Sequence, residues 1–191
     1  MKALEEKILA EGRVLPGNIL KVGSFLNHQL DVPFLMEMGK EIARLYKDCG
    51  VNKILTIETS GIPIAFAAAA HMNVPVVFAK KHKTKNVSGG VYSTVVHSYT
   101  HGTDYTVIVD NEFLSKDDKI LIVDDFLANG KALIGLIDLV NQAKGRVVGA
   151  AVAIEKVFQS GGDALRAEGI RVEALAMIES MTDSELTFRQ S

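Results

Sequence analysis

The stretch Ile120-Leu-Ile-Val-Asp-Asp-Phe-Leu-Ala-Asn-Gly-Lys-Ala132 decides the fold class of this chain. It begins with four branched apolar residues, as expected of a strand that is buried on both faces of a sheet. Two adjacent acids, Asp124 and Asp125, stand where this strand is predicted to end. The carboxyl ends of parallel strands are where open α/β sheets bind ligands, so the two acids are candidate site residues.

The small residues from Ala128 to Ala132 lead into a predicted amphipathic helix. Backbone N–H groups at a helix N-terminus can bind a phosphate, and this loop offers them with almost no side-chain bulk. Two carboxylates beside such a loop suit a sugar phosphate whose hydroxyl groups hydrogen-bond to the acids. The alternative is a solvated strand end followed by an ordinary helix cap, for which Asn129 is a common residue. The combination of acids, spacing and glycine favours the sugar-phosphate site.

Strands and helices alternate through the middle of the chain, which predicts an α/β fold with a mostly parallel central sheet flanked by helices. The 191 residues suit a single domain, 1–191. Residues 1–32 do not fit the alternation, and we expect them to form a small hood at the edge of the sheet. The expected strands are Lys53–Ile57, Val74–Ala79, Ile120–Asp124, Val147–Glu155 and Val172–Ile178, with a hairpin of Thr94–Thr100 and Tyr105–Asp110. The expected helices are Lys2–Glu11, one from Pro33 with Asp31 near its cap, Pro63–His71, one after Ala132, and Asp163–Glu168.

Composition restricts the class of protein further. The formal net charge of -2 offers no electrostatic footprint for nucleic acid as the main partner. Cys49 is the only cysteine, so no intrachain disulfide can form. Charges interrupt the first residues where a signal peptide needs an apolar core, and no window approaches the length of a membrane span. We therefore expect a cytoplasmic protein with no membrane association.

The thirteen residues from Ile120 to Ala132 resemble the signature of the type I phosphoribosyltransferases, which bind 5-phosphoribosyl diphosphate (PRPP). The resemblance implies the fold of that family, with a small hood built from N- and C-terminal segments. It also implies that Asp124 and Asp125 bind the ribose hydroxyls. The residues expected to wrap the 5-phosphate are Ala128, Asn129, Gly130, Lys131 and Ala132. Magnesium bound mainly through PRPP is a further implication, and no separate protein metal site is expected.

A second turn with phosphate character is Glu58-Thr-Ser-Gly61, between a predicted strand and a predicted helix. Ser60 offers a hydroxyl, and Gly61 lets the backbone approach a ligand closely. In the resembled family this turn holds the diphosphate of PRPP. A Ser-Gly pair before a helix is also an ordinary cap, so the prediction depends on the signature.

The basic segment Lys80-Lys-His-Lys-Thr-Lys85 follows a predicted strand and precedes Gly89-Gly90. By itself it is typical of a solvated surface run. In the resembled family a flexible loop closes over the diphosphate, excludes water and stabilises the developing charge. We predict that Lys81 is the catalytic lysine, with Lys80 and Lys83 as alternatives.

Asn27 and Lys156 are candidates for contacting the base, although from the residues alone a turn asparagine and a surface lysine are the better account of them. The resemblance implies that the positions of Leu20, Asn27 and Lys156 contact the base. Lys156 is a pure hydrogen-bond donor, which suits a purine with a carbonyl at its six-position and opposes the amino group of adenine. Asn27 could meet a second carbonyl at the two-position. Phe126 and Phe158 could stack on a purine, although core packing is at least as good an account of them.

Over almost its whole length the chain resembles the bacterial xanthine phosphoribosyltransferases. The segments that carry this resemblance are Leu20–Gln29, Ile57–Ile62, Lys80–Lys83, Asp124–Gly130 and Ile154–Gln159. It implies xanthine and PRPP as substrates, xanthosine 5'-monophosphate as product, a role in purine salvage, and a homodimer. Two positions depart from the wider class: Ala128 replaces a third acid proposed to act as a base, and Lys131 replaces a threonine or serine. No general base can therefore be assigned, a lack that matters less for xanthine because it is partly anionic near neutral pH.

Two kinds of alternative remain. One is the same transfer to guanine, hypoxanthine or adenine. The other is a non-catalytic regulator that keeps the fold to sense PRPP and binds nucleic acid. Such regulators usually add a DNA-binding domain or a strongly basic face, and we expect neither here, because few residues precede the predicted sheet and the net charge is -2.

Overall fold

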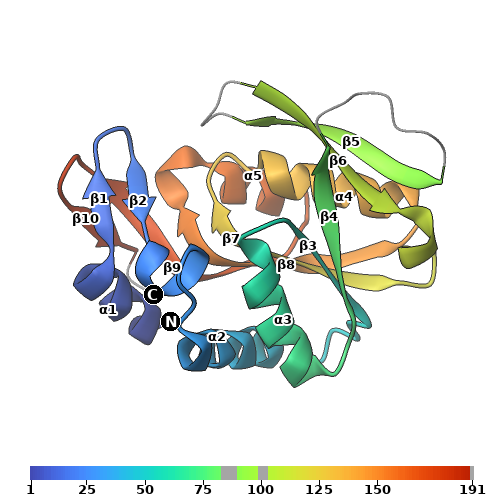
Figure 1. The fold of residues 1–191 in the computed structure, drawn as a ribbon, viewed down its shortest axis with the longest axis horizontal. Helices are drawn as coiled ribbons and strands as arrows, with labels where there is room; N and C mark the ends of the chain where they lie inside the picture. Colours follow the sequence, from blue (N-terminus) through green and yellow to red (C-terminus); the bar gives the residue numbers. More distant parts are fainter. Residues whose placement is uncertain (83–89, 99–102, 190–191) are drawn as a thin grey trace.

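The computed structural model describes residues 1–82, 90–98 and 103–189. Its centre is an eight-stranded mixed sheet in the order β10-β9-β8-β7-β3-β4-β6-β5 (Figure 1). Adjacent strands from β9 to β4 pair in parallel, whereas β10, β6 and β5 pair antiparallel with their neighbours. The strands are β3 Lys53–Ile57, β4 Val76–His82, β5 Val91–Ser98, β6 Thr103–Asp110, β7 Lys119–Leu127, β8 Arg146–Lys156, β9 Val172–Met181 and β10 Leu186–Phe188.

Helices cover both faces of the sheet (Figure 1). On one face α2 (Val32–Leu45) and α3 (Gly61–Met72) bury side chains such as Met38 and Ile64 in a first hydrophobic cluster. On the other face α4 (Lys131–Gln142) and α5 (Gly161–Ala167) contribute Leu136 and Leu165 to a second cluster. No helix within the described ranges is long and apolar enough to cross a membrane.

The β5–β6 hairpin belongs to the second cluster as well. Val96 and Val107 are buried there, and the turn of α4 at Gly135 approaches the Val96 side chain closely. A short 3-10 helix at Asn111–Phe113 follows the hairpin, and a second one at Val157–Gln159 follows β8. The hairpin therefore packs against α4, and its residues Val96, His97 and Tyr105 line a cavity with the segment from the end of β7 to the start of α4.

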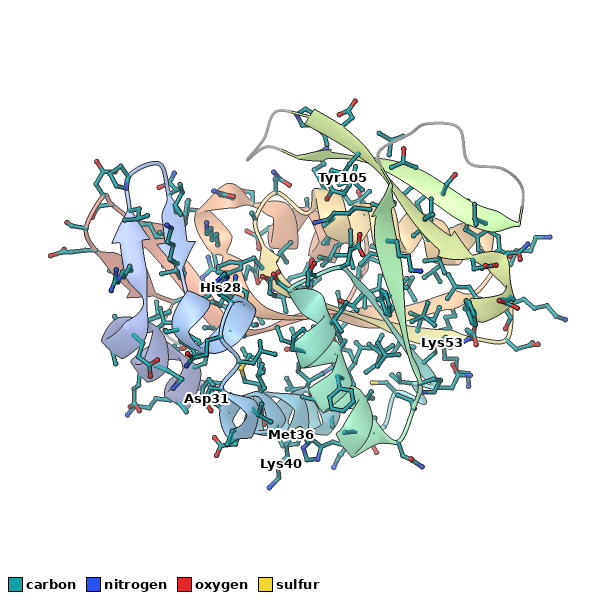
Figure 2. All side chains as sticks on the ribbon, viewed as in Figure 1. His28, Asp31, Met36, Lys40, Lys53 and Tyr105 are labelled. Atoms are coloured by element: carbon teal, nitrogen blue, oxygen red, sulfur yellow. The ribbon has the colours of Figure 1, made fainter. Side chains whose placement is uncertain are left out.

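The N-terminal segment packs at the β9–β10 end of the sheet (Figure 1). It comprises α1 (Lys2–Glu11), a two-stranded sheet of β1 (Arg13–Leu15) and β2 (Ile19–Lys21), and a π-helix at Gly23–Asn27. The Met1 ammonium donates to the carbonyl of Leu175 in β9, and Leu4 and Ile8 join the first hydrophobic cluster. Figure 2 shows Asp31 at the start of α2, where its Oδ1 accepts from the Phe34 N–H at 3.2 Å and caps the helix.

The sequence predicted the parallel core, the hairpin and most helices correctly, but several boundaries were wrong. The strand predicted to end at Asp124 continues to Leu127, because its pairing with β8 extends to Glu155. The strand predicted at Val74–Ala79 begins at Val76 and runs to His82, because its last residues pair with β6. The short C-terminal helix begins at Gly161 rather than Asp163. Residues 99 and 100 of the predicted hairpin lie outside the described residues, as does Lys83.

Candidate active site

The two acids are the sixth and seventh of the nine residues of β7, in the half of the strand toward the carboxyl edge of the sheet. Asp124 is 5% exposed, and its Oδ1 accepts from the Asp125 N–H at 2.9 Å. The Oδ1 of Asp125 accepts from the Phe126 N–H at 3.0 Å. Burial raises the pKa of the Asp124 carboxyl well above its ordinary value, and the adjacent charge of Asp125 acts in the same direction. The Lys81 ammonium opposes this shift of the Asp124 pKa.

The predicted phosphate loop lies between β7 and α4. Its residues line a cavity of about 190 Å³ together with Tyr105 of the hairpin and Phe126. The loop members are Ala128, Asn129, Gly130, Lys131 and Ala132. Gly130 precedes the first turn of α4 with a φ of 81°, and the Lys131 N–H donates to Asn129 Oδ1 at 3.1 Å. The cavity is thus lined by the loop at the N-terminus of α4, whose amides can bind a phosphate, and this loop begins three residues after Asp125.

Ser60 and Gly61 form the start of α3, directly beside the acids. A Cβ added to Gly61 would lie 2.9 Å from Asp124 Oδ1 and would collide with the Thr56 hydroxyl. Only glycine therefore allows the β3–α3 turn to approach β7 this closely. The Ser60 side chain makes no capping hydrogen bond, and the neighbouring Glu58–Thr59 peptide is cis.

Lys81 stands near the end of β4 with its side chain toward the acids. Its backbone N–H donates to Glu58 Oε1 at 2.6 Å, and its Nζ lies 5.3 Å from the centroid of the Tyr105 ring. Tyr105 lies in β6 beside the end of β4 (Figure 2). Burial raises the pKa of the Tyr105 hydroxyl, with a further contribution from the charge of Asp124. Lys80, the neighbouring alternative, lines a separate apolar cavity with Phe78.

The predicted base residues Lys156 and Asn27 reach the same edge from different elements. Lys156 is the last residue of β8, and its Nζ donates to the Asn18 carbonyl at 2.7 Å and lies 5.5 Å from the Phe126 ring centroid. Burial lowers the pKa of the Lys156 ammonium. Asn27 Nδ2 donates to Asp125 Oδ2 at 3.4 Å. Asn27 thus contacts one of the acids, and Lys156 lies over the ring of Phe126, the residue that follows them.

The remaining candidates for the base are placed differently. Leu20 is 7% exposed and belongs to the first hydrophobic cluster, so most of its surface packs against the protein. Phe126 also packs against that cluster, whereas Phe158 is 37% exposed.

Sequence reasoning missed three residues of the site: Glu58, Tyr105 and Gly161. Glu58 was seen as part of a turn, but its contact with the Lys81 amide requires the parallel pairing of β3 with β4. Tyr105 reaches the cavity through the register of β6 on β4. The N–H of Gly161 donates to the Ala128 carbonyl at 3.1 Å, and only its place in a Ser-Gly-Gly turn after the β8 strand could have suggested this.

The fold and this site define a phosphoribosyltransferase, and a phosphoribosyl transferase domain matches residues 32–163. Adenine phosphoribosyltransferase from Rhodothermus marinus superimposes with a TM-score of 0.72 at 22% identity, covering 93% of this chain and 99% of that one. The enzyme of the same name from Thermoanaerobacter pseudethanolicus gives a TM-score of 0.73 at 18% identity, covering 91% and 99%. At these identities the likeness shows the shared fold.

Sequence relatives specify the family more narrowly. A xanthine phosphoribosyltransferase from Alkaliphilus metalliredigens is 52% identical over 189 residues, which are 99% of this chain and 94% of the relative. That of Clostridioides difficile is 51% identical over 190 residues, covering 99% and 100%. The chain belongs to the xanthine phosphoribosyltransferase family.

Proposed function

We propose that this enzyme transfers the 5-phosphoribosyl group of PRPP to xanthine in purine salvage, giving xanthosine 5'-monophosphate and diphosphate. The observation that carries the proposal is that Asp124 and Asp125 lie in β7 just before the cavity-lining loop 128–132. Asn27 reaches Asp125, and the Lys156 ammonium lies over the adjacent Phe126 ring. The family membership supports the choice of xanthine over other bases, because the relatives about half identical to this chain carry that name.

In the proposed reaction a ring nitrogen of xanthine forms a bond to the anomeric carbon of PRPP. The bond from that carbon to the diphosphate oxygen breaks, and the electron pair leaves with diphosphate. The ribose hydroxyls donate to Asp124 and Asp125, while backbone amides of the loop 128–132 bind the 5-phosphate. These contacts hold the anomeric carbon in line with the base, and such positioning is a large part of the catalytic effect.

Charge on the departing diphosphate needs stabilisation, and we assign this role to Lys81 together with the Ser60–Gly61 turn. The Lys81 ammonium lies 5.3 Å from the centroid of the Tyr105 ring, and its charge opposes the rise in the pKa of Asp124. A preorganised cation is most effective where water is excluded. The contact with Tyr105 supports this assignment, since a cation over an aromatic ring is held in place without losing its donors to another acid.

For the base, Lys156 is assigned to the carbonyl at the six-position and Asn27 to the carbonyl at the two-position. An ammonium can only donate, so it suits a carbonyl and disfavours the amino group of adenine. Xanthine becomes the nucleophile by releasing a ring proton to solvent before it binds, since it is partly anionic near neutral pH, and this reduces the need for a protein base. This agrees with the presence of Ala128 where other classes place an acid.

Magnesium is proposed to accompany PRPP. The described part of the chain contains no group of three or more His, Cys, Asp or Glu residues arranged to hold a metal. Mg²⁺ usually keeps several waters and uses few carboxylates plus substrate phosphates, a pattern that Asp124 and Asp125 fit. When bound, the ion neutralises charge on the diphosphate.

We further propose a cytoplasmic homodimer in which residues 1–32 act as a hood over the base. Exposed aromatic side chains on neighbouring elements support self-association: Phe66 is 65%, Phe78 42% and Phe113 51% exposed. The hood proposal is supported by the contact of Asn27 with Asp125 and of Asn18 with Lys156. Sedimentation velocity tests the dimer, and a monomer at micromolar concentration contradicts it.

A base panel tests the proposed reaction. Purified protein, PRPP and magnesium are mixed with xanthine, guanine, hypoxanthine or adenine, and diphosphate release is followed. Release with xanthine well above the other bases is the expected result. Preferential release with another base would keep the mechanism and overturn the specificity. No release with any base would overturn the enzymatic function and would favour the alternative of a PRPP-sensing regulator.

A further inference from the structure

Glu155 is a buried carboxylate near the site to which the proposed reaction gives no role. It is 1% exposed and directly precedes Lys156 at the end of β8. Arg166 in α5 binds both of its oxygens, with Nη1 to Oε1 at 2.8 Å and Nη2 to Oε2 at 2.6 Å. A buried carboxylate is costly unless it is paired in such a geometry, so the two side chains form one unit.

This ion pair fixes the first turn of α5. Arg166 Nη2 also donates to the carbonyl of Val172 in β9 at 3.3 Å, which ties α5 to the sheet. A Cβ added to Gly162 would lie 2.7 Å from Arg166 Nη1 and would collide with the Glu155 carboxylate. The backbone at the start of α5 therefore rests directly on the ion pair.

The same turn supports the loop that is assigned to the 5-phosphate. The Gly161 N–H donates to the Ala128 carbonyl at 3.1 Å. A Cβ added to Gly161 would lie 2.5 Å from both the Asn129 carbonyl carbon and the Gly130 nitrogen. Backbone therefore touches backbone here, and a displacement of α5 is transmitted to the loop amides.

We propose that Glu155 and Arg166 are positioning residues for the phosphate loop. They touch no substrate. They hold the start of α5 against residues 128–130, so that the amides of the loop keep the geometry that binds the ribose 5-phosphate end of PRPP. The inference rests on the proposed function, because it takes this loop as the 5-phosphate site. The diphosphate end of PRPP is assigned to Ser60 and Gly61 at the start of α3 and to Lys81 on β4, so it does not depend on α5.

The test uses ribose 5-phosphate and inorganic diphosphate as separate probes, with binding measured by calorimetry. Glu155→Gln keeps the shape of the side chain and removes its charge, which leaves the exposed Asp163, with its Oδ1 3.4 Å from Nη1, as the remaining carboxylate beside Arg166. The Kd for ribose 5-phosphate is expected to rise by about tenfold, the lower range seen when a residue that orients a ligand-binding group is lost. The Kd for diphosphate is expected to stay within about twofold, since that subsite keeps its supports. Glu179→Gln is the matched control, because it breaks an exposed ion pair with Arg189 and is expected to change neither Kd.

A merely structural role would weaken the binding of both probes, so a selective loss of ribose 5-phosphate affinity identifies a positioning role. Equal losses for both ligands, or an unchanged Kd for ribose 5-phosphate, would overturn the inference and leave the proposed function standing. Gly161→Ala provides a second variant, which keeps the ion pair and displaces the loop directly, because the added Cβ would lie 2.5 Å from the Gly130 nitrogen. This variant is expected to weaken the binding of ribose 5-phosphate but not of diphosphate. Unchanged affinity for ribose 5-phosphate would overturn the inference, even where Glu155→Gln does not fold. Failure of the unmodified protein to bind either probe would overturn the proposed function as well.

Discussion

Replacing Asp124 with asparagine is expected to stabilise the fold and weaken PRPP use at the same time. Asp124 is 5% exposed, and an asparagine amide oxygen can still accept the 2.9 Å hydrogen bond from the Asp125 N–H. The substitution removes a charge that burial and Asp125 both disfavour, as the raised pKa of Asp124 indicates. We expect a gain of about 1 kcal/mol in the free energy of unfolding, typical when a strained functional residue is relieved. For a chain of this size the gain corresponds to a rise in Tm of roughly 2–4 °C.

The pH dependence of this gain has a definite sign. Because the folded pKa of Asp124 is raised, the folded state takes up its proton at a higher pH than the unfolded state does. The wild-type protein therefore gains stability as the pH falls through the folded pKa, until it passes the unfolded value of about 3.9. The difference in Tm between the variant and the wild type should be largest at alkaline pH and should shrink on acidification.

Thermal unfolding across this pH range measures the stability, and diphosphate release measures the activity. Hydrogen bonds to charged groups are worth about 1.5–3 kcal/mol, so loss of the carboxylate should lower kcat/KM for PRPP by roughly 10–150-fold. Asp183→Asn, at an exposed position far along the chain, is the control and should change neither quantity. A Tm that falls in Asp124→Asn, or a difference that grows on acidification, would refute the assignment of a strained buried carboxylate. Unimpaired turnover in Asp124→Asn combined with Asp125→Asn would refute the ribose contacts.

Two further substitutions test the base and diphosphate contacts. Lys156→Met should raise KM for xanthine by roughly 10–100-fold, which corresponds to the loss of one charged hydrogen bond, and should leave PRPP affinity within about twofold. Equal losses for both substrates would argue against a base contact. Lys116→Met, at an exposed position, is the control. Lys81→Gln should lower kcat by roughly 10–100-fold while ribose 5-phosphate affinity stays unchanged. Lys80→Gln should have little effect on turnover, and a larger effect there than at Lys81 would reassign the catalytic lysine.

The two carboxylates and the loop after them could be recognised from sequence because they are consecutive residues in one strand–loop–helix segment. The residues that surround them in the fold could not be recognised from sequence. Asn27 and Asp125 are separated by 98 positions, and their contact exists only because the N-terminal segment packs at one end of the sheet. Even within the segment, the length of β7 was underestimated, since the pairing with β8 rather than local composition decides where the strand ends.

The basic segment Lys80–Lys85 likewise has features that the sequence indicates and features that only the fold decides. Composition cannot distinguish Lys80 from Lys81, because both are exposed lysines in one run. In the fold, strand alternation sends Lys80 toward the apolar cavity at Phe78 and Lys81 toward Tyr105 and Asp124. Tyr105 itself had no local signal, because only the antiparallel register of β6 on β4 brings it to the cavity.

By itself, the sequence determined the chemistry that is encoded locally: a buried strand, two acids, a small-residue loop and the class of ligand they suit. Tertiary structure alone decided which distant groups surround that chemistry. The Glu155–Arg166 ion pair and the contact of Gly161 with Ala128 depend on how α5 packs against the end of β8. The physical reason is that hydrophobic patterning specifies which face of an element is buried, whereas close contacts between elements depend on register and packing over the whole chain.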